Sequence, residues 1–305
     1  MAVRSETVKA EQRVTVGKQA TRQVGMWQRK SFQRNVRAAI AYLFLLVGSF
    51  CFLLPLLWMF STSLKPDDEV FAFPPRFLPT SWDWNNYVLG WTALPFNTYL
   101  VNTIIVTTSN VLGNLISCSL PAYAFARLRA RGSNVLFMLV LATMMVPFQV
   151  IMIPTFILFT NLGWVNTFLP ITVPAWFGWP FSIFLLRQFF MGLPRELDDA
   201  ARIDGCSYFR IYWNIILPLS KPALATIAIF GFIGNWNNFL GPLIYINKQE
   251  LYTLALGLNL FRGQYVTYYN QLMAVSLLAL APILIVFFFT QKQFIQGIAL
   301  TGIKG

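Results

Sequence analysis

Long stretches of this sequence contain no charged residue, and they constrain the fold more than any other feature. Residues 38–64 and residues 133–186 hold no Asp, Glu, Lys or Arg. A helix needs about 20 consecutive apolar residues to cross the hydrocarbon core of a bilayer. Runs of this length therefore predict membrane-spanning helices. The overall composition agrees, because 11% of the residues are charged against about 25% in an average soluble domain.

Gaps between charges place six spans and predict an all-α integral membrane protein. The long run from 133 to 186 is divided by the turn-forming residues 161–166. We expect spans at residues 38–60, 100–125, 134–159, 168–189, 222–246 and 271–290. The third and fourth should be kinked by their prolines, which are Pro147, Pro154, Pro170, Pro174 and Pro180. The domains are then a basic N-terminal tail (1–37), a six-helix membrane domain (38–290) and a C-terminal tail (291–305).

Positive charge is distributed unevenly between the two sides of these spans. With the N-terminus in the cytoplasm, 19 of the 23 Lys and Arg residues fall on the cytoplasmic side. Cytoplasmic loops of membrane proteins carry an excess of Lys and Arg. Six spans then place both termini in the cytoplasm. The net charge of +12 is explained by this orientation, so we expect contact with membrane lipid and no nucleic-acid partner.

Several kinds of chemistry are disfavoured by what the spans lack. Their apolar cores hold no acid, base or histidine, which proton-coupled carriers and membrane enzymes usually need. The three cysteines have no metal-binding spacing. A phosphate-binding loop would read GxxxxGK[ST], and the nearest approach, at 297–304, has Ile303 between its glycine and lysine. We therefore expect no metal and no nucleotide site on this chain.

A polar stretch at residues 194–218 interrupts the apolar runs and is predicted to form a helical hairpin. Pro194 suits the start of a helix, and Gly205 suits a left-handed stop. Ser207 can cap a second helix over 208–216, which Pro218 would end. The hairpin lies on the cytoplasmic side in the orientation above.

The spacing within this hairpin resembles the EAA loop of ABC importer permeases, E-A-A-x3-G-x9-I-x-L-P. Aspartate replaces the usual glutamate. The matching residues are Asp199, Ala200, Ala201, Gly205, Ile215, Leu217 and Pro218. Residues 197–205, 236–239 and 296–305 resemble the sugar-importer branch, including the maltose-importer (MalG-like) permeases.

The resemblance implies a permease subunit in the plasma (inner) membrane of a bacterium or archaeon. Its partners would be a second homologous permease, two copies of an ABC ATPase and an extracytoplasmic solute-binding protein, with a sugar as substrate. ATP and Mg would bind to the ATPase, so that this chain needs no cofactor and has no catalytic residue. The hairpin would couple the spans to the ATPase. Asp199 would pair with a basic group on the ATPase groove or brace the loop internally.

Amide and aromatic side chains in the fifth span are candidates for contacts with a sugar. They are Asn235, Trp236, Asn237 and Asn238. Amides in spans also bridge helices by hydrogen bonds, and both interpretations stay open for this cluster. The alternative function is a passive channel or a structural membrane partner without an ATPase. An integral membrane enzyme is less favoured, because the spans lack acids and histidines.

Overall fold

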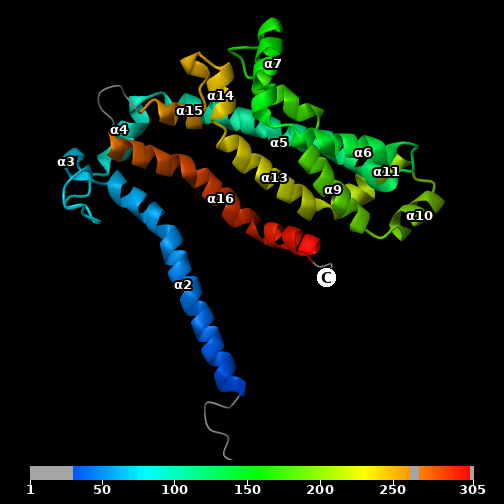
Figure 1. Cartoon of the computed structure of the whole chain (residues 1–305), viewed down its shortest axis with the longest axis horizontal. Coiled ribbons are helices and arrows are strands. Elements are labelled where there is room, and N and C mark those ends of the chain that lie inside the picture. Colours follow the sequence, from blue (N-terminus) through cyan, green and yellow to red (C-terminus); the bar gives the residue numbers. More distant parts are fainter. Residues whose placement is uncertain (1–29, 262–267, 303–305) are drawn as a thin grey trace, which may run out of the picture. The chain divides into compact units, whose positions relative to one another are not determined.

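The structure is a computed structural model that describes residues 30–261 and 268–302, with side chains for 34–261 and 268–291. These residues form helices joined by turns and loops, and no strand occurs among them (Figure 1). The chain divides into two compact units, Met1–Trp58 and Met59–Gly305. The first unit holds most of the first helix, and all later elements belong to the second.

The elements differ widely in length. The longer helices are α2 (Lys30–Ser63), α5 (Phe96–Arg127), α6 (Ser133–Ala142), α7 (Phe148–Asn161), α9 (Pro180–Gly192), α13 (Lys221–Trp236) and α16 (Tyr269–Gly302). The shorter α-helices are α3 (Asp67–Val70), α4 (Asn85–Ala93), α8 (Leu169–Thr172), α10 (Glu196–Ile203), α11 (Tyr208–Ile211), α12 (Leu217–Leu219), α14 (Leu240–Tyr245) and α15 (Leu254–Asn259). The remaining turns are the 3-10 helices η2 (Thr143–Met145), η3 (Val173–Phe177) and η5 (Gln249–Leu251) and the π-helix η4 (Tyr212–Ile216).

Four stretches of helix are long and apolar enough to cross a membrane, namely Arg34–Ser63, Phe96–Arg127, Leu169–Gly192 and Tyr269–Gln291. Two further pairs of helices meet the same criteria but are bent at a short break, and counting each pair as one span gives six. The predicted fold class, an all-α membrane protein with six spans, is therefore confirmed.

The third expected span, 134–159, is not a single kinked helix. Its two halves, Ser133–Met145 (α6 continued by η2) and α7, meet at 94°. Val146 and Pro147 lie between them with extended backbone, ψ 112° and ψ 142°. Proline disfavours the helical conformation in the residue before it and has no N–H to continue the helix. Pro147 thus produces a full break, whereas Pro180 is the first residue of α9 and starts a helix instead of kinking one.

Two helices extend beyond the predicted spans into the predicted tails. Helix α2 begins at Lys30, and α16 continues to Gly302. Helical backbone need not end where the apolar residues end, because long basic side chains such as that of Arg34 favour helix and carry their charge to water. Residues 1–29 and 303–305 of the two tails lie outside the described residues.

Helix α5 is the central element of the second unit. It packs against α9, α13, η3 and α15, and it contributes to both hydrophobic cores. One core contains Phe96 and Tyr99 at the start of α5 together with Trp236 and Val275. The other contains the α5 residues Cys118, Ala122, Tyr123 and Ala126, with Leu186 and Phe190 of α9. The end of α5 at Arg127 is thereby held firmly within the fold.

Buried amides of α5 cross to neighbouring segments. Asn102 donates hydrogen bonds to the carbonyls of Glu250 and Tyr252, at 2.7 and 3.0 Å. Asn110 donates to the Ile171 carbonyl at 3.0 Å and to Oδ1 of Asn235 at 2.5 Å. A polar group in an apolar surrounding needs such partners. These amides therefore hold helices together.

We predict opposite effects for alanine at two helical glycines. A β-carbon at Gly257 would overlap Cδ2 of the buried Tyr99 ring, whereas one at Gly234 would meet nothing within 4 Å. Gly257→Ala should lower the free energy of unfolding by about 1–3 kcal/mol through overpacking. Gly234→Ala should leave it equal or raise it by up to about 1 kcal/mol, because alanine favours helix. Denaturation of the purified chain in detergent measures both, and equal values would contradict the packing of α15 on α5.

Candidate functional site

The predicted hairpin is present as two short helices joined by a sharp turn. Gly205 has φ +78°. Its N–H donates to the carbonyl of Arg202 at 3.0 Å, and the N–H of Cys206 donates to the carbonyl of Ala201 at 2.9 Å. This pair of bonds is the Schellman arrangement that ends a helix on a left-handed glycine. Ser207 then caps α11 by accepting from the N–H of Arg210 at 3.3 Å. Both the glycine stop and the serine cap are confirmed.

The second helix of the hairpin is less regular than predicted. A π-helical segment, η4, follows α11 and ends directly before Leu217 and Pro218. Pro218 does not end the helix, which runs on through Leu219 and then meets α13 at 75°. Proline interrupts the usual bonding to the residue four before it, and a wider turn upstream accommodates that interruption. The bend falls at Ser220, whose hydroxyl donates to the Ile216 carbonyl at 2.7 Å.

Three of the seven EAA-like residues attach the hairpin to the rest of the molecule. Ala201 is 5% exposed and belongs to the hydrophobic core at the end of α5. Ile215 and Leu217 pack against the same core. The neighbouring Ile211 and Ile216 are fully buried there. These residues make the hairpin part of the α5–α9 core.

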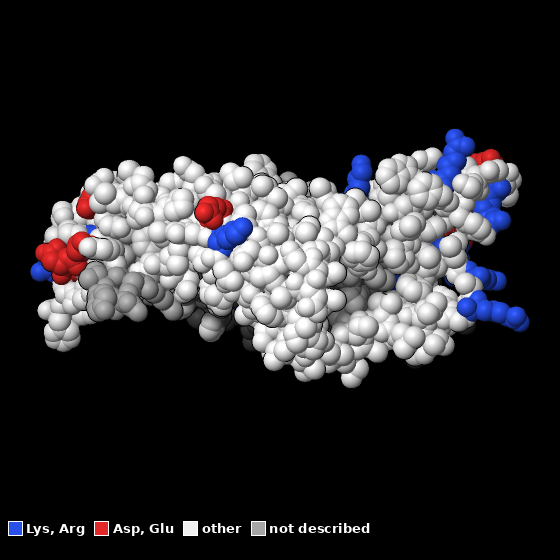
Figure 2. Space-filling model, turned by 90° about the horizontal axis from the view of Figure 1, so that it is seen from above, with Lys and Arg blue, Asp and Glu red and all other residues white. Residues whose placement is uncertain are grey.

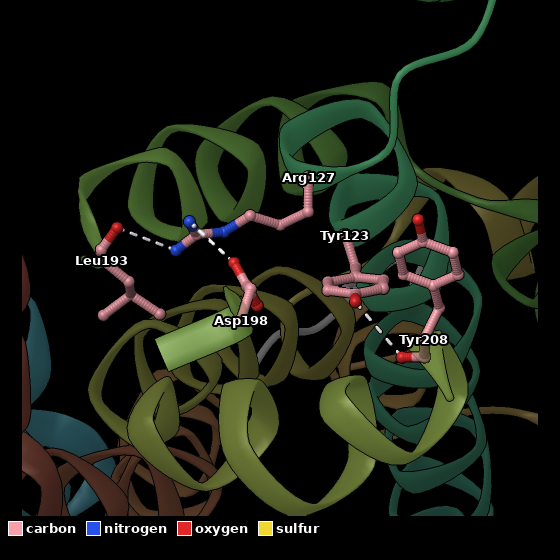
Figure 3. Close-up of polar contacts among 5 residues, drawn as sticks. All are labelled: Tyr123, Arg127, Leu193, Asp198 and Tyr208. Atoms are coloured by element: carbon pink, nitrogen blue, oxygen red, sulfur yellow. Dashed lines mark hydrogen bonds and ion pairs between the residues drawn. The ribbon is translucent and has the colours of Figure 1, made fainter. Parts of the chain in front are cut away.

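An ion pair joins the hairpin to the last residue of α5. Nη1 of Arg127 lies 3.0 Å from Oδ2 of Asp198 on α10. Nη2 of Arg127 donates to the Leu193 carbonyl at 2.9 Å. On the other helix, the hydroxyl of Tyr123 donates to the Tyr208 carbonyl at 3.2 Å. Figure 3 shows that these contacts tie both arms of the hairpin to α5.

Burial changes the pKa of the carboxylate in this pair. The side chains of Arg127 and Asp198 are 4% and 18% exposed. Loss of water raises the pKa of Asp198 from its ordinary value, and the Arg127 guanidinium only partly opposes that rise. In a buried pair, desolvation can exceed the attraction between the charges. The pair therefore contributes more to the placement of α10 against α5 than to stability.

The other EAA-like residues lie on the outer side of the hairpin. Asp199, Ala200 and Pro218 are exposed. Large apolar side chains accompany them, because Ile203, at the end of α10, is 88% exposed, and Phe209 and Trp213 are 63% and 61% exposed. An exposed apolar group rimmed by polar residues marks an interaction surface. We call Asp199, Ala200, Ile203, Phe209 and Trp213 the outer face of the hairpin.

Sequence reasoning did not identify the partners in the internal brace. It named Asp199 as a candidate, but in the structure Asp198 faces Arg127 and Asp199 is exposed. Arg127 was considered only as one positive charge among several. Its position at the end of a span, on the same expected side of the membrane as the acids of residues 196–204, is the signal that could have suggested an ion pair.

The amide–aromatic cluster of the fifth span has mixed surroundings. Asn235 accepts from Asn110 and donates to the Gly231 carbonyl at 2.7 Å. The indole of Trp236 is buried and donates to the Ala279 carbonyl at 3.0 Å. Asn238 accepts from the N–H of Gly241 at 3.1 Å. Asn237 is exposed, and within the described part of the chain its side chain bonds only to the Ile233 carbonyl, at 2.9 Å. A sugar contact by these residues stays a prediction.

Nothing among the described residues groups three or more histidines, cysteines or acids for a metal ion. The features that this part of the molecule offers are instead a buried ion pair and an exposed, largely apolar outer face, which suits a contact with another macromolecule.

We predict that removing one member of the ion pair loosens the hairpin more than removing both. Arg127→Met leaves the Asp198 carboxylate buried and unpaired, which costs about 3–5 kcal/mol. The double variant R127M/D198L should recover most of that loss. The rate of hydrogen exchange at the backbone amides of α10 measures how far the hairpin opens in each variant. Arg129→Met is the control, because Arg129 forms no ion pair in the described part of the chain. A double variant as open as the single one would contradict the brace.

Comparisons with known proteins show the family of this chain. The family model described as "Binding-protein-dependent transport system inner membrane component" matches residues 113–300, which include the hairpin. The arabinooligosaccharides transport system permease protein AraQ of Halalkalibacterium halodurans is 36% identical over 84% of this chain and 93% of its own length. The sn-glycerol-3-phosphate transport system permease protein UgpE of Pectobacterium atrosepticum is 33% identical over 85% of this chain and 94% of its own length.

A solved structure has the same fold. It is a bacterial ABC transporter involved in the import of the acidic polysaccharide alginate. The superposed chain is 26% identical, with a TM-score of 0.76, and the match covers 85% of this chain and 97% of that chain. The protein therefore belongs to the family of binding-protein-dependent transport system inner membrane components.

Proposed function

We propose that this chain is the permease subunit of an ATP-driven carbohydrate importer, and that its hairpin receives the force of a separate ATPase. The observation that carries the proposal is the two-sided hairpin. Its inner side is locked to α5 by the Arg127–Asp198 pair and by buried apolar residues. Its outer face exposes Ile203, Phe209 and Trp213. An element held rigidly on one side and apolar on the other can carry a displacement from a partner into the spans.

The groove of an ABC ATPase is the partner that fits this outer face. A short helix that enters a groove needs small residues beside its apolar anchors. Ala200 supplies a small side chain and Ile203 an anchor, both exposed on α10. Asp199, exposed and one residue before Ala200, is placed to meet a basic group on the groove wall. ATP and Mg then bind to the ATPase, and this chain carries no cofactor and no catalytic residue.

The hairpin and both termini lie on the cytoplasmic side in this proposal. The distribution of 19 of 23 Lys and Arg residues supports it. In Figure 2, Lys and Arg side chains gather at the end of the molecule where Figure 1 places α10, and Asp and Glu are prominent at the other end. The membrane is the inner membrane of a bacterium or archaeon.

The complete importer would contain a second, homologous permease, two copies of the ATPase and an extracytoplasmic solute-binding protein. In that complex, this chain would form one half of the translocation pathway and the second permease would form the other half. The relatives named above support a carbohydrate or a related solute as cargo. Neutral hydroxyl groups suit exposed amides such as that of Asn237. No observation favours a passive channel or a purely structural role.

Gly205 provides a test of coupling. A side chain at this position would meet nothing within 4 Å, so its effect comes from the positive φ. Valine there costs about 1–2 kcal/mol, which corresponds to about a 5–30-fold change in an equilibrium. We expect Gly205→Val to reduce substrate-stimulated ATPase activity of the whole complex by that factor. Gly205→Asn should retain most activity, since asparagine tolerates the left-handed conformation.

Gly192→Ala is the matched control, because a β-carbon there also meets nothing within 4 Å and no positive φ is involved. Wild-type coupling in the valine variant would contradict the role of the hairpin. A complex that fails to assemble would be detected by co-purification before the ATPase measurement.

Asn237 and Asn235 should respond differently to alanine. We expect Asn237→Ala to lower the rate of sugar uptake in proteoliposomes and to leave the unfolding midpoint unchanged, because Asn237 is exposed. Asn235→Ala removes the bond to Asn110 and should lower the stability by about 0.6–1.7 kcal/mol. Normal uptake by the Asn237 variant would remove this residue from the pathway.

A further inference from the structure

Five arginines line one open cavity of about 660 Å³ beside the hairpin. The cavity lies between the end of α5, the start of α6, the end of α9 and the residue before α10. We call it the arginine pocket, and its basic residues are Arg127, Arg129, Arg131, Arg187 and Arg195. Lys and Arg side chains are conspicuous at this end of the molecule in Figure 2.

The positive charge in the pocket is mostly unbalanced. No acidic residue lines it, and Asp198 beside it pairs with Arg127. In the part of the chain that the structure describes, the other four arginines form no ion pair. Like charges held together in one cavity repel one another. An anion in the pocket would relieve that repulsion.

Two of these arginines are held in place by contacts that leave some of their N–H groups available for a ligand. Arg187 donates from Nε to the Phe125 carbonyl at 3.2 Å, and its guanidinium lies 4.1 Å from the centre of the Phe137 ring. Arg127 is more than nine-tenths buried, and its Nε has no hydrogen-bond partner among the described residues. A planar guanidinium with unused N–H groups matches the oxygens of a phosphate.

The start of α6 adds backbone donors to the same cavity. Gly132 precedes the helix with φ +81°, and no side chain caps the first turn. Ser133, Asn134 and Val135 of that turn line the pocket. The N–H of Ser133 already donates to the Ala130 carbonyl at 3.2 Å. Within the described part of the chain, the N–H groups left for an anion are therefore those of Asn134 and Val135. Uncapped N–H groups at the start of a helix attract anions.

One rim of the pocket is apolar. Val135 and Met191 line it and are 56% and 50% exposed. The exposed apolar surface continues along α6 with Leu136, Met138 and Leu139. The ligand should therefore combine an anionic head with an apolar body. We propose that the arginine pocket binds the phosphate of an anionic phospholipid headgroup, with the acyl chains along α6. Assignment to the inner leaflet rests on the orientation proposed above, whereas the binding chemistry does not.

The test uses the purified full-length chain in a neutral detergent. It is titrated with dioctanoyl phosphatidylglycerol, with phosphatidylcholine of the same chain length, or with inorganic phosphate. The unfolding midpoint reports binding, since a ligand of the folded state stabilises it, and native mass spectrometry counts retained lipid. We expect phosphatidylglycerol alone to raise the midpoint and to be retained.

Variants locate the binding. R129Q/R131Q should weaken the apparent affinity for phosphatidylglycerol at least tenfold. R129K/R131K keeps the positive charge but loses the paired N–H groups of the planar guanidinium, and it should weaken the affinity less. R76Q/K248Q removes the same charge from two exposed residues outside the pocket and should have no effect.

Four results would overturn the proposal. They are equal binding of phosphatidylcholine, an equal effect of inorganic phosphate, unchanged lipid binding in R129Q/R131Q, and weaker binding of the ATPase by that variant without any change in lipid binding. The second identifies a soluble phosphate as the ligand, and the last identifies a protein contact. A fifth result, an importer that couples normally but binds no phosphatidylglycerol, would also refute this site and would leave the proposed function intact.

Discussion

Hydrocarbon offers the backbone no hydrogen-bond partner, and this constraint sets the architecture of the protein. The described spans are helical, and Pro147 breaks the third of them between α6 and α7 because proline prevents helix there. Helix α5 lies at the centre, and its side-chain amides donate hydrogen bonds to backbone carbonyls of the neighbouring segments. Its amides Asn102 and Asn110 bond to carbonyls of segments that are not regular helix or that end there.

The hairpin uses one short sequence for two purposes. Residues such as Ala201 and Ile216 are buried and connect it to the core around α5 and α9, whereas Ala200 and Ile203, on the same short helix as Ala201, are exposed. The two roles fall on different faces of the helix, because neighbouring residues of a helix point in different directions. The tight Gly205 turn joins two arms that both contact α5. In the function that we propose, movement of the outer face would move α5 as well.

Arg127 connects the two features that we propose to be functional. It braces α10 through Asp198, and it also lines the arginine pocket. A headgroup phosphate in that pocket would either compete with the Asp198 carboxylate for the Arg127 guanidinium or bind to its remaining N–H groups. The lipid environment and the coupling element would then be linked through one side chain, which gives a physical route by which anionic lipid could influence transport.

The sequence by itself determined the all-helical membrane fold, the approximate spans, the hairpin and its glycine turn, because these depend on the length of apolar runs and on local backbone preferences. Tertiary structure decided which side chains meet. Asp198 and Asp199 are adjacent and carry the same charge, but they point about 100° apart on a helix, and only packing against α5 decides that Asp198 faces Arg127. In the same way, Asn235 bridges to Asn110 while Asn237 is exposed, and arginines from 127 to 195 enclose one pocket. Such contacts join residues far apart in the chain, so local patterns do not contain them.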